Sequence, residues 1–194
     1  MVRLDIRAEK KSLRSEFKKY RRDMSKQEKA AKDFEILNRI VALPEYKNAK
    51  MLLTYVSTDI EVDTKALIEG AFIDGKTVLV PKCVDGKIDM KFYKITSLSD
   101  LKPGAFGVLE PENCEEVTEF CDAVCILPGL GFDLKGYRLG YGKGYYDRFL
   151  ANFNGKNIGV CYNICLKSLI PHGKYDKMVD VLVTEKFVKR FNSK

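Results

Sequence analysis

The sequence predicts an α/β domain built around a mainly parallel sheet. Three observations lead to this prediction: short apolar runs that end in turn residues, helical patterns between those runs, and a chain length that suits one hydrophobic core. The apolar runs are Met51–Val56, Thr77–Val80, Ala123–Leu127 and Ile158–Tyr162. Near-continuous apolar runs of this length are typical of parallel strands that are buried on both faces. With 194 residues, 45% of them hydrophobic, the chain is expected to form one domain over residues 1–194.

Two helical patterns precede the first predicted strand. From about residue 6 to residue 23, apolar residues recur at helical spacing within a highly charged segment. Ser25 and Glu28 then form the pattern of a capping box, which predicts a second helix that ends near Leu43, before Pro44. The sheet is therefore expected to follow two N-terminal helices.

Two strand-to-helix passages follow. Asp63 and Thr64 are suited to cap a helix between the first two predicted strands, and Gly75 is suited to end it. A second passage runs from the strand at Leu127 through a glycine-rich segment into a helical pattern near residues 143–153. Strands that alternate with helices in this way are typical of parallel α/β sheets.

Ligands of α/β sheets bind beyond the carboxyl ends of the parallel strands. Three segments are therefore expected to share one rim of the sheet. They are the segments that end at Ser57, Pro128 and Tyr162. Residues 83–118 are less regular, with a hairpin expected around Asp85-Gly86 and a loop at Lys102-Pro103-Gly104.

The composition limits the class of protein. No run approaches the roughly 18 apolar residues that cross a bilayer, and the N-terminus has no apolar signal-peptide core, so a cytoplasmic protein that does not act on a membrane is expected. The net charge of +7 permits an anionic ligand without identifying one. The six cysteines and the single histidine, His172, lack the usual spacing of zinc ligands, and we expect reduced, partly buried thiols.

The most informative segment is Arg138–Asp147, which reads RLGYGKGYYD. Gly140, Gly142 and Gly144 remove every second side chain, so the backbone can adopt positive φ and bring its N–H groups close to a ligand. Lys143 adds a positive charge, and the helical pattern that follows offers the N–H groups of its first turn. The segment matches neither a Walker A loop nor a dinucleotide fingerprint. It predicts an anion-binding loop with phosphate as the expected ligand, although a bare glycine loop fits a tight structural turn equally well.

Two further groups of charged residues are candidates for binding. Lys10, Lys11 and Arg14 lie within one turn of the first predicted helix, where they can grip a polyphosphate or simply form a solvated charged face. Glu61 follows the first predicted strand. Because Asp63 can serve as a helix cap, Glu61 is the more suitable ligand there for a polar or cationic edge of a substrate.

Two aspartates are candidates for an oxygen-coordinated magnesium ion. Magnesium usually binds one or two carboxylates together with phosphate oxygens and water, and Asp147 and Asp180 offer such carboxylates. By spacing alone, either can equally be a surface acid or a cap. His172 stands in a Pro-His-Gly segment and is expected to be an ordinary exposed loop histidine.

Taken together, these segments resemble the 5-formyltetrahydrofolate cyclo-ligase family, whose members are also called methenyltetrahydrofolate synthetases. The central block is the most specific part: Pro-Gly-x-Gly-Phe-Asp is followed by Arg-Leu-Gly-x-Gly-x-Gly-Tyr-Tyr-Asp. The resemblance covers residues 10–14, 57–64, 107–111, 127–133, 138–148 and 180–185. It implies a compact three-layer α/β/α Rossmann-like domain that converts 5-formyltetrahydrofolate into 5,10-methenyltetrahydrofolate in an ATP- and magnesium-dependent ring closure that releases ADP and phosphate.

The resemblance also implies roles for particular residues. ATP would bind Lys10, Lys11, Ser12, Leu13, Arg14, Arg138, Leu139, Gly140, Tyr141, Gly142, Lys143, Gly144, Tyr145 and Tyr146. The folate substrate would bind Val56, Glu61, Tyr141, Gly142, Lys143, Gly144 and Tyr145. Mg2+ would bind Asp147 and Asp180, and the catalytic residues would be Lys143, Arg138 and Tyr145. Alignment and charge neutralisation would suffice for the reaction, so neither a nucleophilic cysteine nor a histidine base is expected.

The sequence departs from the family pattern in one place. Relatives often carry a His-Asp pair a few residues before the final aspartate, whereas this chain has Tyr175-Asp176 there. Glu110 fits the family pattern but has no role that the sequence reveals. The expected partners are small molecules, with ATP as co-substrate, and a monomer is expected.

Two alternatives remain open from the sequence alone. The first is a basic RNA-binding module, because Lys143-Gly144-Tyr145 begins like an RRM aromatic motif, but the acid at Asp147 is poorly placed against a phosphate backbone. The second is an ATP-dependent ligase of the same fold with a different substrate, since fold similarity does not fix a substrate.

Overall fold

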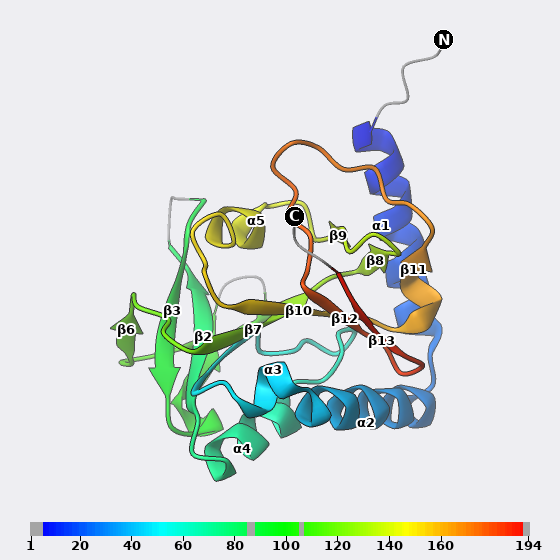
Figure 1. The fold of residues 1–194 in the computed structure, drawn as a ribbon. Helices are drawn as coiled ribbons and strands as arrows, with labels where there is room; N and C mark the ends of the chain where they lie inside the picture. The colour runs from blue at the N-terminus through cyan, green and yellow to red at the C-terminus, as the bar shows by residue number, and fades with distance from the viewer. Residues whose placement is uncertain (1–5, 85–87, 105–106, 192–194) are drawn as a thin grey trace.

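The structure is a computed structural model that describes residues 6–84, 88–104 and 107–191. Within these ranges an eight-stranded sheet runs through the centre of the molecule (Figure 1). In order across the sheet, its strands are β13 (Val188–Arg190), β12 (Val181–Val183), β10 (Lys156–Val160), β7 (Ala123–Pro128), β1 (Met51–Thr54), β2 (Thr77–Cys83), β3 (Met90–Ile95) and β6 (Glu115–Val117).

The centre of the sheet is parallel and its edges are antiparallel. The inner strands β12, β10, β7, β1 and β2 pair in parallel, and Leu52 of β1 lies opposite Val78 of β2 and Val124 of β7. The strands β13, β3 and β6 add in antiparallel fashion. All four predicted strands are present, and a mainly parallel sheet is confirmed.

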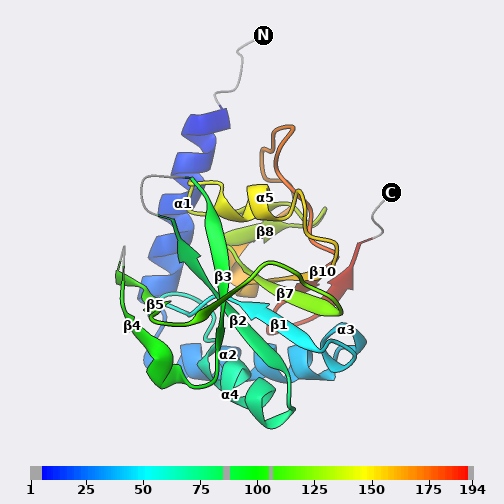
Figure 2. The ribbon, with the colours of Figure 1, turned by 90° about the vertical axis from the view of Figure 1, so that its left-hand side faces the viewer.

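Helices cover both faces of the sheet. They are α1 (Ile6–Asp23), α2 (Lys26–Ala42), α3 (Pro44–Lys47), α4 (Lys65–Ile73) and α5 (Tyr145–Phe149). In Figure 1, α2, α3 and α4 lie below the sheet and α5 lies above it, while α1 stands beside the upper layer. Figure 2, turned by 90°, shows α1 running past α5 towards the layer of α2. The three-layer arrangement and the two N-terminal helices agree with the prediction.

The N-terminal caps predicted for α2 and α4 are only partly present. Ser25 Oγ accepts a hydrogen bond from the backbone N of Glu28 at 3.1 Å, but the Glu28 carboxylate pairs with Lys32 at 2.7 Å. Only the Ser25 half of the predicted capping box is therefore present. Thr64 occupies the cap position of α4, yet its hydroxyl donates to the carbonyl of Tyr55 at 2.7 Å. Its side chain is used to close the loop after β1.

Helix α5 is shorter than the pattern near residues 143–153 predicts. It ends at Phe149, and Leu150 already takes the cap position. The apolar side chains that produced the helical pattern still pack inward: the rings of Phe149 and Phe153 have centroids 5.1 Å apart. The packing was therefore predicted correctly, but the backbone there is a short helix followed by turns.

Small strands complete the fold. A three-stranded sheet contains β11 (Leu166–Lys167), β8 (Gly131–Asp133) and β9 (Arg138–Leu139), and β4 (Leu101–Pro103) pairs with β5 (Leu109–Pro111). The predicted loop at Lys102-Pro103-Gly104 is wrong for Lys102 and Pro103, which belong to β4, whereas Gly104 lies beyond the end of that strand. The predicted hairpin is confirmed by the antiparallel pairing of β2 with β3, although Asp85-Gly86 lie outside the described residues. Short 3-10 helices cover Leu98–Asp100 and Asn163–Cys165.

Two general properties bear on the predictions. Across the described ranges, no helix combines the length and apolar character that spanning a membrane requires. The six cysteines are free, and Cys125, Cys161 and Cys165 are buried in the hydrophobic core.

Candidate active site

A cavity of about 580 Å³ opens at the carboxyl ends of β1, β2 and β7. Its walls come from α1, the loop after β1, the glycine-rich segment before α5, and β5. The rim predicted from the strand ends is therefore present: Val56 and Pro128 both line the cavity. Tyr162 lies behind the wall, where it supports the loop that carries Glu61.

The glycine-rich segment is held in place by α1. Arg14 Nε donates to the carbonyl O of Gly140 at 2.9 Å. Gly142 and Gly144 have φ of +101° and +74°, a backbone conformation that favours glycine. A Cβ on Gly142 would lie 3.3 Å from Arg14 Nη2. The positive φ therefore favours glycine at both positions, and at Gly142 the close approach of the arginine adds to this preference.

Arg138 joins three parts of the site. Its Nη2 donates to Asp147 Oδ1 at 3.0 Å, its Nη1 donates to the carbonyl of Pro128 at 3.2 Å, and its guanidinium carbon lies 5.4 Å from the centroid of the Tyr146 ring. The Arg138 side chain is only 6% exposed. Burial raises the pKa of Tyr146, whose hydroxyl has no hydrogen-bond partner among the described residues. Through its bonds to Asp147 and to the carbonyl of Pro128, Arg138 therefore fixes the start of α5 against the end of β7.

Glu61 is held as a hydrogen-bond acceptor at the cavity wall. Tyr141 Oη donates to Glu61 Oε1 at 2.9 Å, and the backbone N and the hydroxyl of Thr58 donate to Glu61 Oε2 at 2.9 and 2.8 Å. Burial and the nearby negative charge of Glu61 raise the pKa of Tyr141. Two segments that the sequence separates by 80 residues thus meet at this carboxylate.

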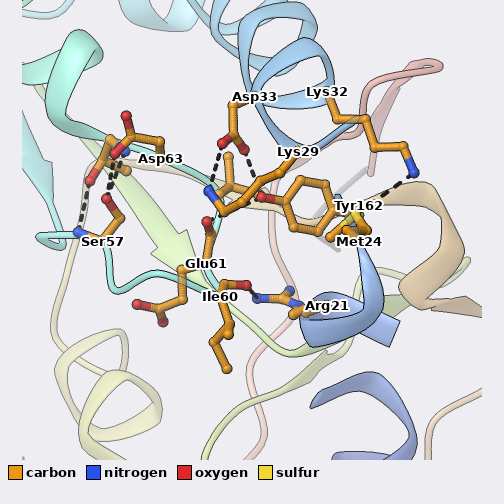
Figure 3. A network of polar contacts seen from close by, with 12 residues as sticks. Arg21, Met24, Lys29, Lys32, Asp33, Ser57, Ile60, Glu61, Asp63 and Tyr162 are labelled. Atoms are coloured by element: carbon orange, nitrogen blue, oxygen red, sulfur yellow. Dashed lines mark hydrogen bonds and ion pairs between the residues drawn. The ribbon is translucent and has the colours of Figure 1, made fainter. Parts of the chain in front are cut away.

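A polar network lies behind Glu61 (Figure 3). Tyr162 Oη lies 2.7 Å from Asp33 Oδ1 and 3.1 Å from the backbone O of Glu61. Lys29 Nζ donates to Asp33 Oδ2 at 2.7 Å, so α2 takes part in positioning the loop after β1. On the same loop, Ser57 Oγ donates to Asp63 Oδ1 at 2.7 Å. The cavity wall is therefore supported by side chains from the opposite layer.

The predicted residues of α1 separate into two groups. Lys10 and Arg14 line the cavity. Lys11 and Ser12 are exposed, and Leu13 packs against the apolar cluster beneath α1, so none of these three lines it. An α-helix places residues four apart on one face, which explains the separation.

The same spacing identifies two cavity residues that the sequence reading missed. Lys18 and Arg22 also line the cavity, and they continue the four-residue spacing of Lys10 and Arg14. Between them in the sequence, Arg21 is buried at 3% exposure, and its Nη1 donates to the carbonyl of Ile60 at 3.2 Å. Extending the Lys10/Arg14 face by two turns would have found both.

The two predicted metal ligands do not come together. Asp147 lines the cavity at the carboxyl ends of the strands. Asp180 lies at their amino ends, where its Oδ2 accepts from the backbone N of Asn157 at 2.9 Å. Asn157 stands near the start of β10 and Asp180 directly precedes β12, so both lie at the amino ends of parallel strands. One ion cannot contact both carboxylates across the sheet.

Asp176 occupies the place that Asp180 was expected to fill. It lines the cavity, and its Oδ2 accepts from Lys10 Nζ at 2.7 Å and from the backbone N of Gly173 at 2.7 Å. Burial opposes its ionisation, but these bonds and the positive charges of Lys10 and Arg138 prevail and lower the pKa of Asp176. Among the described residues, no group of three or more His, Cys, Asp or Glu side chains is arranged to hold a metal.

The remaining predicted residues have clear places. Lys143 and Tyr145 line the cavity, and Tyr145 also packs against the aromatic cluster above the sheet. Glu110 of β5 lines it as well, which the sequence did not reveal. His172 is exposed, as expected, and its ring stacks on Tyr137 with centroids 3.5 Å apart.

The cavity therefore combines a cationic helix face, a glycine loop with helix N–H groups, and fixed acidic acceptors. This arrangement is suited to hold a polyanion beside a neutral ring system that donates hydrogen bonds. Among the described residues of the cavity, the carboxylates of Asp147, Asp176 and Glu61 are held by cations or by hydroxyl and amide donors.

Comparison with known proteins gives a consistent result. A sequence model of the 5-formyltetrahydrofolate cyclo-ligase family matches residues 6–185. The probable 5-formyltetrahydrofolate cyclo-ligase of Schizosaccharomyces pombe is 32% identical over 180 residues, which cover 82% of this chain and 87% of the relative. The 5-formyltetrahydrofolate cyclo-ligase of Mus musculus is 29% identical over 198 residues, covering 95% and 98%.

A solved structure agrees with these sequences. The 5,10-methenyltetrahydrofolate synthetase of Aquifex aeolicus superposes with a TM-score of 0.83 at 35% identity, covering 95% of this chain and 94% of that protein. The synthetase from Mycoplasma pneumoniae has a TM-score of 0.74 at 23% identity, which supports the fold.

Proposed function

This chain belongs to the 5-formyltetrahydrofolate cyclo-ligase family, and from that membership we propose that it closes the ring of 5-formyltetrahydrofolate to give 5,10-methenyltetrahydrofolate at the expense of ATP. The observation that carries the proposal is the meeting of Glu61 and Tyr141 in the same cavity as Arg138, Asp147 and the glycine loop. A site for a hydrogen-bonding ring thus adjoins a site for a polyphosphate. Cytoplasmic location belongs to the same proposal.

The chemistry explains why both sites are needed. The formyl oxygen is a poor leaving group until it is phosphorylated. In the proposed sequence this oxygen attacks the γ-phosphorus and ADP leaves. N10 then attacks the activated formyl carbon and loses its proton, and the C–O bond breaks to release phosphate. The protein has to align the two substrates and neutralise charge, which are the main tasks in phosphoryl transfer.

The phosphate side would be built from α1 and the glycine loop. Lys10, Arg14 and Lys143 are the cations that line that part of the cavity. Backbone N–H groups of Gly142 and Gly144 are suited to approach phosphate oxygens closely, because no side chain intervenes. Lys11, Ser12 and Leu13 would support this site through the helix backbone, since their side chains do not line the cavity.

The acidic groups of the cavity are suited to hold a magnesium ion, but with a different pair of residues from the one that the sequence predicted. Asp147 makes its hydrogen bond through Oδ1 and Asp176 through Oδ2, so each presents a second carboxylate oxygen. These two residues, and not Asp180, would hold the ion together with phosphate oxygens and water. The ion would neutralise charge on the transferred phosphoryl group. Asp147 and Asp176 would in turn orient Arg138 and Lys10 around it.

The folate side would be built from the loop after β1 and the tyrosines. Glu61, held by Thr58 and Tyr141, would accept hydrogen bonds from the amino and N–H groups of the pterin ring. Val56 is buried at the cavity wall and would pack against the ring, together with the flat face of Tyr145.

One assay tests the proposal directly. Purified protein is mixed with ATP, magnesium and (6S)-5-formyltetrahydrofolate, and the near-ultraviolet absorbance of methenyltetrahydrofolate is followed at acidic pH together with phosphate release. We expect one phosphate for each ring closed. Lys143→Ala should lower kcat/KM on the order of a hundredfold, because it removes a cation at the reacting phosphate.

Lys135→Ala is the matched control, since Lys135 is exposed on the turn between β8 and β9. It should behave as the wild type does. A folded wild-type protein that forms no methenyltetrahydrofolate, or forms it without ATP, would contradict the proposal.

A further inference from the structure

Helix α1 crosses the candidate active site, and four of its cations face the cavity. They are Lys10, Arg14, Lys18 and Arg22. Because each is four residues from the next, neighbouring cations lie about 40° apart around the helix, and the four form a gently winding row that lines one cavity. At a rise of about 1.5 Å per residue, Lys18 lies about 12 Å and Arg22 about 18 Å from Lys10 along the helix.

The two ends of this cationic face have different partners. Lys10 pairs with Asp176 at 2.7 Å, and Arg14 Nε donates to the carbonyl of Gly140. Lys18 Nζ lies 5.5 Å from the centroid of the Tyr141 ring. Within the part of the chain that the structure describes, neither Lys18 nor Arg22 takes part in an ion pair. The second end is therefore a cationic surface without an acidic protein partner.

This second end lies beside the residues proposed for folate. Arg21 Nη1 donates to the carbonyl of Ile60, which fixes the last turns of α1 against the loop that carries Glu61. Tyr141, which lies under Lys18 Nζ, donates to that same Glu61. The helix thus runs from Asp176 and the glycine loop at one end of the cavity to the Glu61 loop at the other.

We infer that Lys18 and Arg22 form a second anion subsite, which binds the carboxylates of the glutamate tail of the folate substrate. This inference rests on the proposed function. The formyl group must lie next to the γ-phosphate, so the tail has to extend away from the phosphate end. The last glutamate of the tail carries two carboxylates. A cation pair about 12–18 Å along α1 from Lys10 is suited to receive them through charge-assisted hydrogen bonds.

A pair of substrates separates this role from a structural one. KM is measured for (6S)-5-formyltetrahydrofolate and for 5-formyltetrahydropteroate, which has the same rings and no glutamate. The double variant Lys18→Ala/Arg22→Ala should raise KM for the folate on the order of thirtyfold, because it removes two cations that contact carboxylates. KM for the pteroate, KM for ATP and kcat should stay unchanged.

Lys19→Ala is the matched control, because Lys19 lies on the same helix, is exposed and does not line the cavity. It should leave both KM values unchanged. An unchanged KM for the folate in the double variant would overturn the subsite. An equal rise for folate and pteroate would also overturn it, because the loss of affinity would then not depend on the glutamate.

Calorimetric binding of the same two compounds keeps this test separate from the proposed function. If the wild type performs no ring closure, the proposed reaction fails. The subsite then stands if the folate binds more tightly than the pteroate and the double variant abolishes that difference. It fails if the two compounds bind alike.

Discussion

The two faces of the central sheet are covered in different ways. Below the sheet, α2 and α4 are regular helices whose aliphatic side chains, such as Ile36 and Ile68, are fully buried. Above it, the cover consists of the five-residue α5, loops and a cluster of aromatic rings, among them Phe92 and Phe149 with centroids 4.7 Å apart. The cavity opens on this irregular side. Long helices satisfy their own backbone groups, whereas short helices and loops leave N–H groups for a ligand.

The difference suggests that the lower layer provides stability and the upper layer provides binding. The carboxylates make the sharpest contrast, because Asp147 lies at the cavity and Asp180 lies at the amino ends of the strands. Four changes test this division, from the largest expected effect to the smallest.

The first change compares Asp147→Asn with Asp180→Asn. Losing the charge at Asp147 removes the partner of Arg138 and one of the two carboxylates proposed to hold magnesium, so kcat/KM should fall on the order of a thousandfold. Asp180→Asn should change kcat/KM of the folded enzyme by less than about threefold, because no part of it lines the cavity. Steady-state kinetics of both variants check this. A similar loss of kcat/KM in both variants would contradict the conclusion that Asp180 lies outside the active site.

The second change compares the two layers through their packing. Ile68→Ala below the sheet should lower the free energy of unfolding by about 2–5 kcal/mol, through lost burial and a cavity. Its kcat/KM at low temperature should be unaltered. Phe149→Ala at the end of α5 should lower stability and also raise KM for ATP, because α5 follows directly on the glycine loop. Denaturant unfolding and kinetics measure both. A kinetic defect of equal size in Ile68→Ala would contradict the division.

The third change removes a hydroxyl that connects the layers. Tyr162→Phe should cost about 1–2 kcal/mol, because Asp33 and the backbone O of Glu61 lose a partner. KM for the folate should rise several-fold, because the backbone of Glu61 loses the contact from Tyr162 while its carboxylate keeps Tyr141 and Thr58. Tyr46→Phe is the matched control, since Tyr46 Oη donates to Asp74 at 3.0 Å below the sheet. It should reduce stability to a similar extent without changing KM, and a rise in KM in both variants would refute the connection.

The fourth change concerns pH. The pKa of Asp176 is lowered in the folded protein, so its ion pair with Lys10 contributes stability above the unfolded pKa of about 4 and loses that contribution as the pH falls through the folded pKa. The side chains are 16% and 22% exposed, which limits the expected contribution to about 1 kcal/mol. Unfolding of the wild type and Asp176→Asn should differ at pH 6 and converge below about pH 4. A constant difference across this range would contradict the assignment.

Much of the fold was readable from the sequence, because it depends on local patterns. Apolar runs identified the buried strands, and helical spacing identified α1 and α2. The prediction lost accuracy where packing outweighed the local signal. Phe153 follows a helical pattern, yet the helix ends at Phe149, and both rings still pack into an aromatic cluster above the sheet. Lys102-Pro103 reads as a loop but pairs with β5.

The sequence by itself determined the family, the mainly parallel sheet and the residue types of the glycine-rich segment. Those features reside in contiguous motifs, and the spacing of glycines and charges within a motif needs no knowledge of distant segments. Even the missed cations Lys18 and Arg22 follow from helical periodicity.

Only the tertiary structure decided which acids share the cavity. Asp176 and Asp180 are four residues apart. Asp176 nevertheless contacts Lys10 at the cavity, whereas Asp180 contacts Asn157 at the amino ends of the parallel strands. Strand β12 starts directly after Asp180, which fixes that residue at the amino end of the strands, while Asp176 belongs to the preceding loop. Glu61 likewise gains its role from Tyr141 and Tyr162. Such contacts depend on how the chain crosses the sheet, and that information is not contained in any single motif.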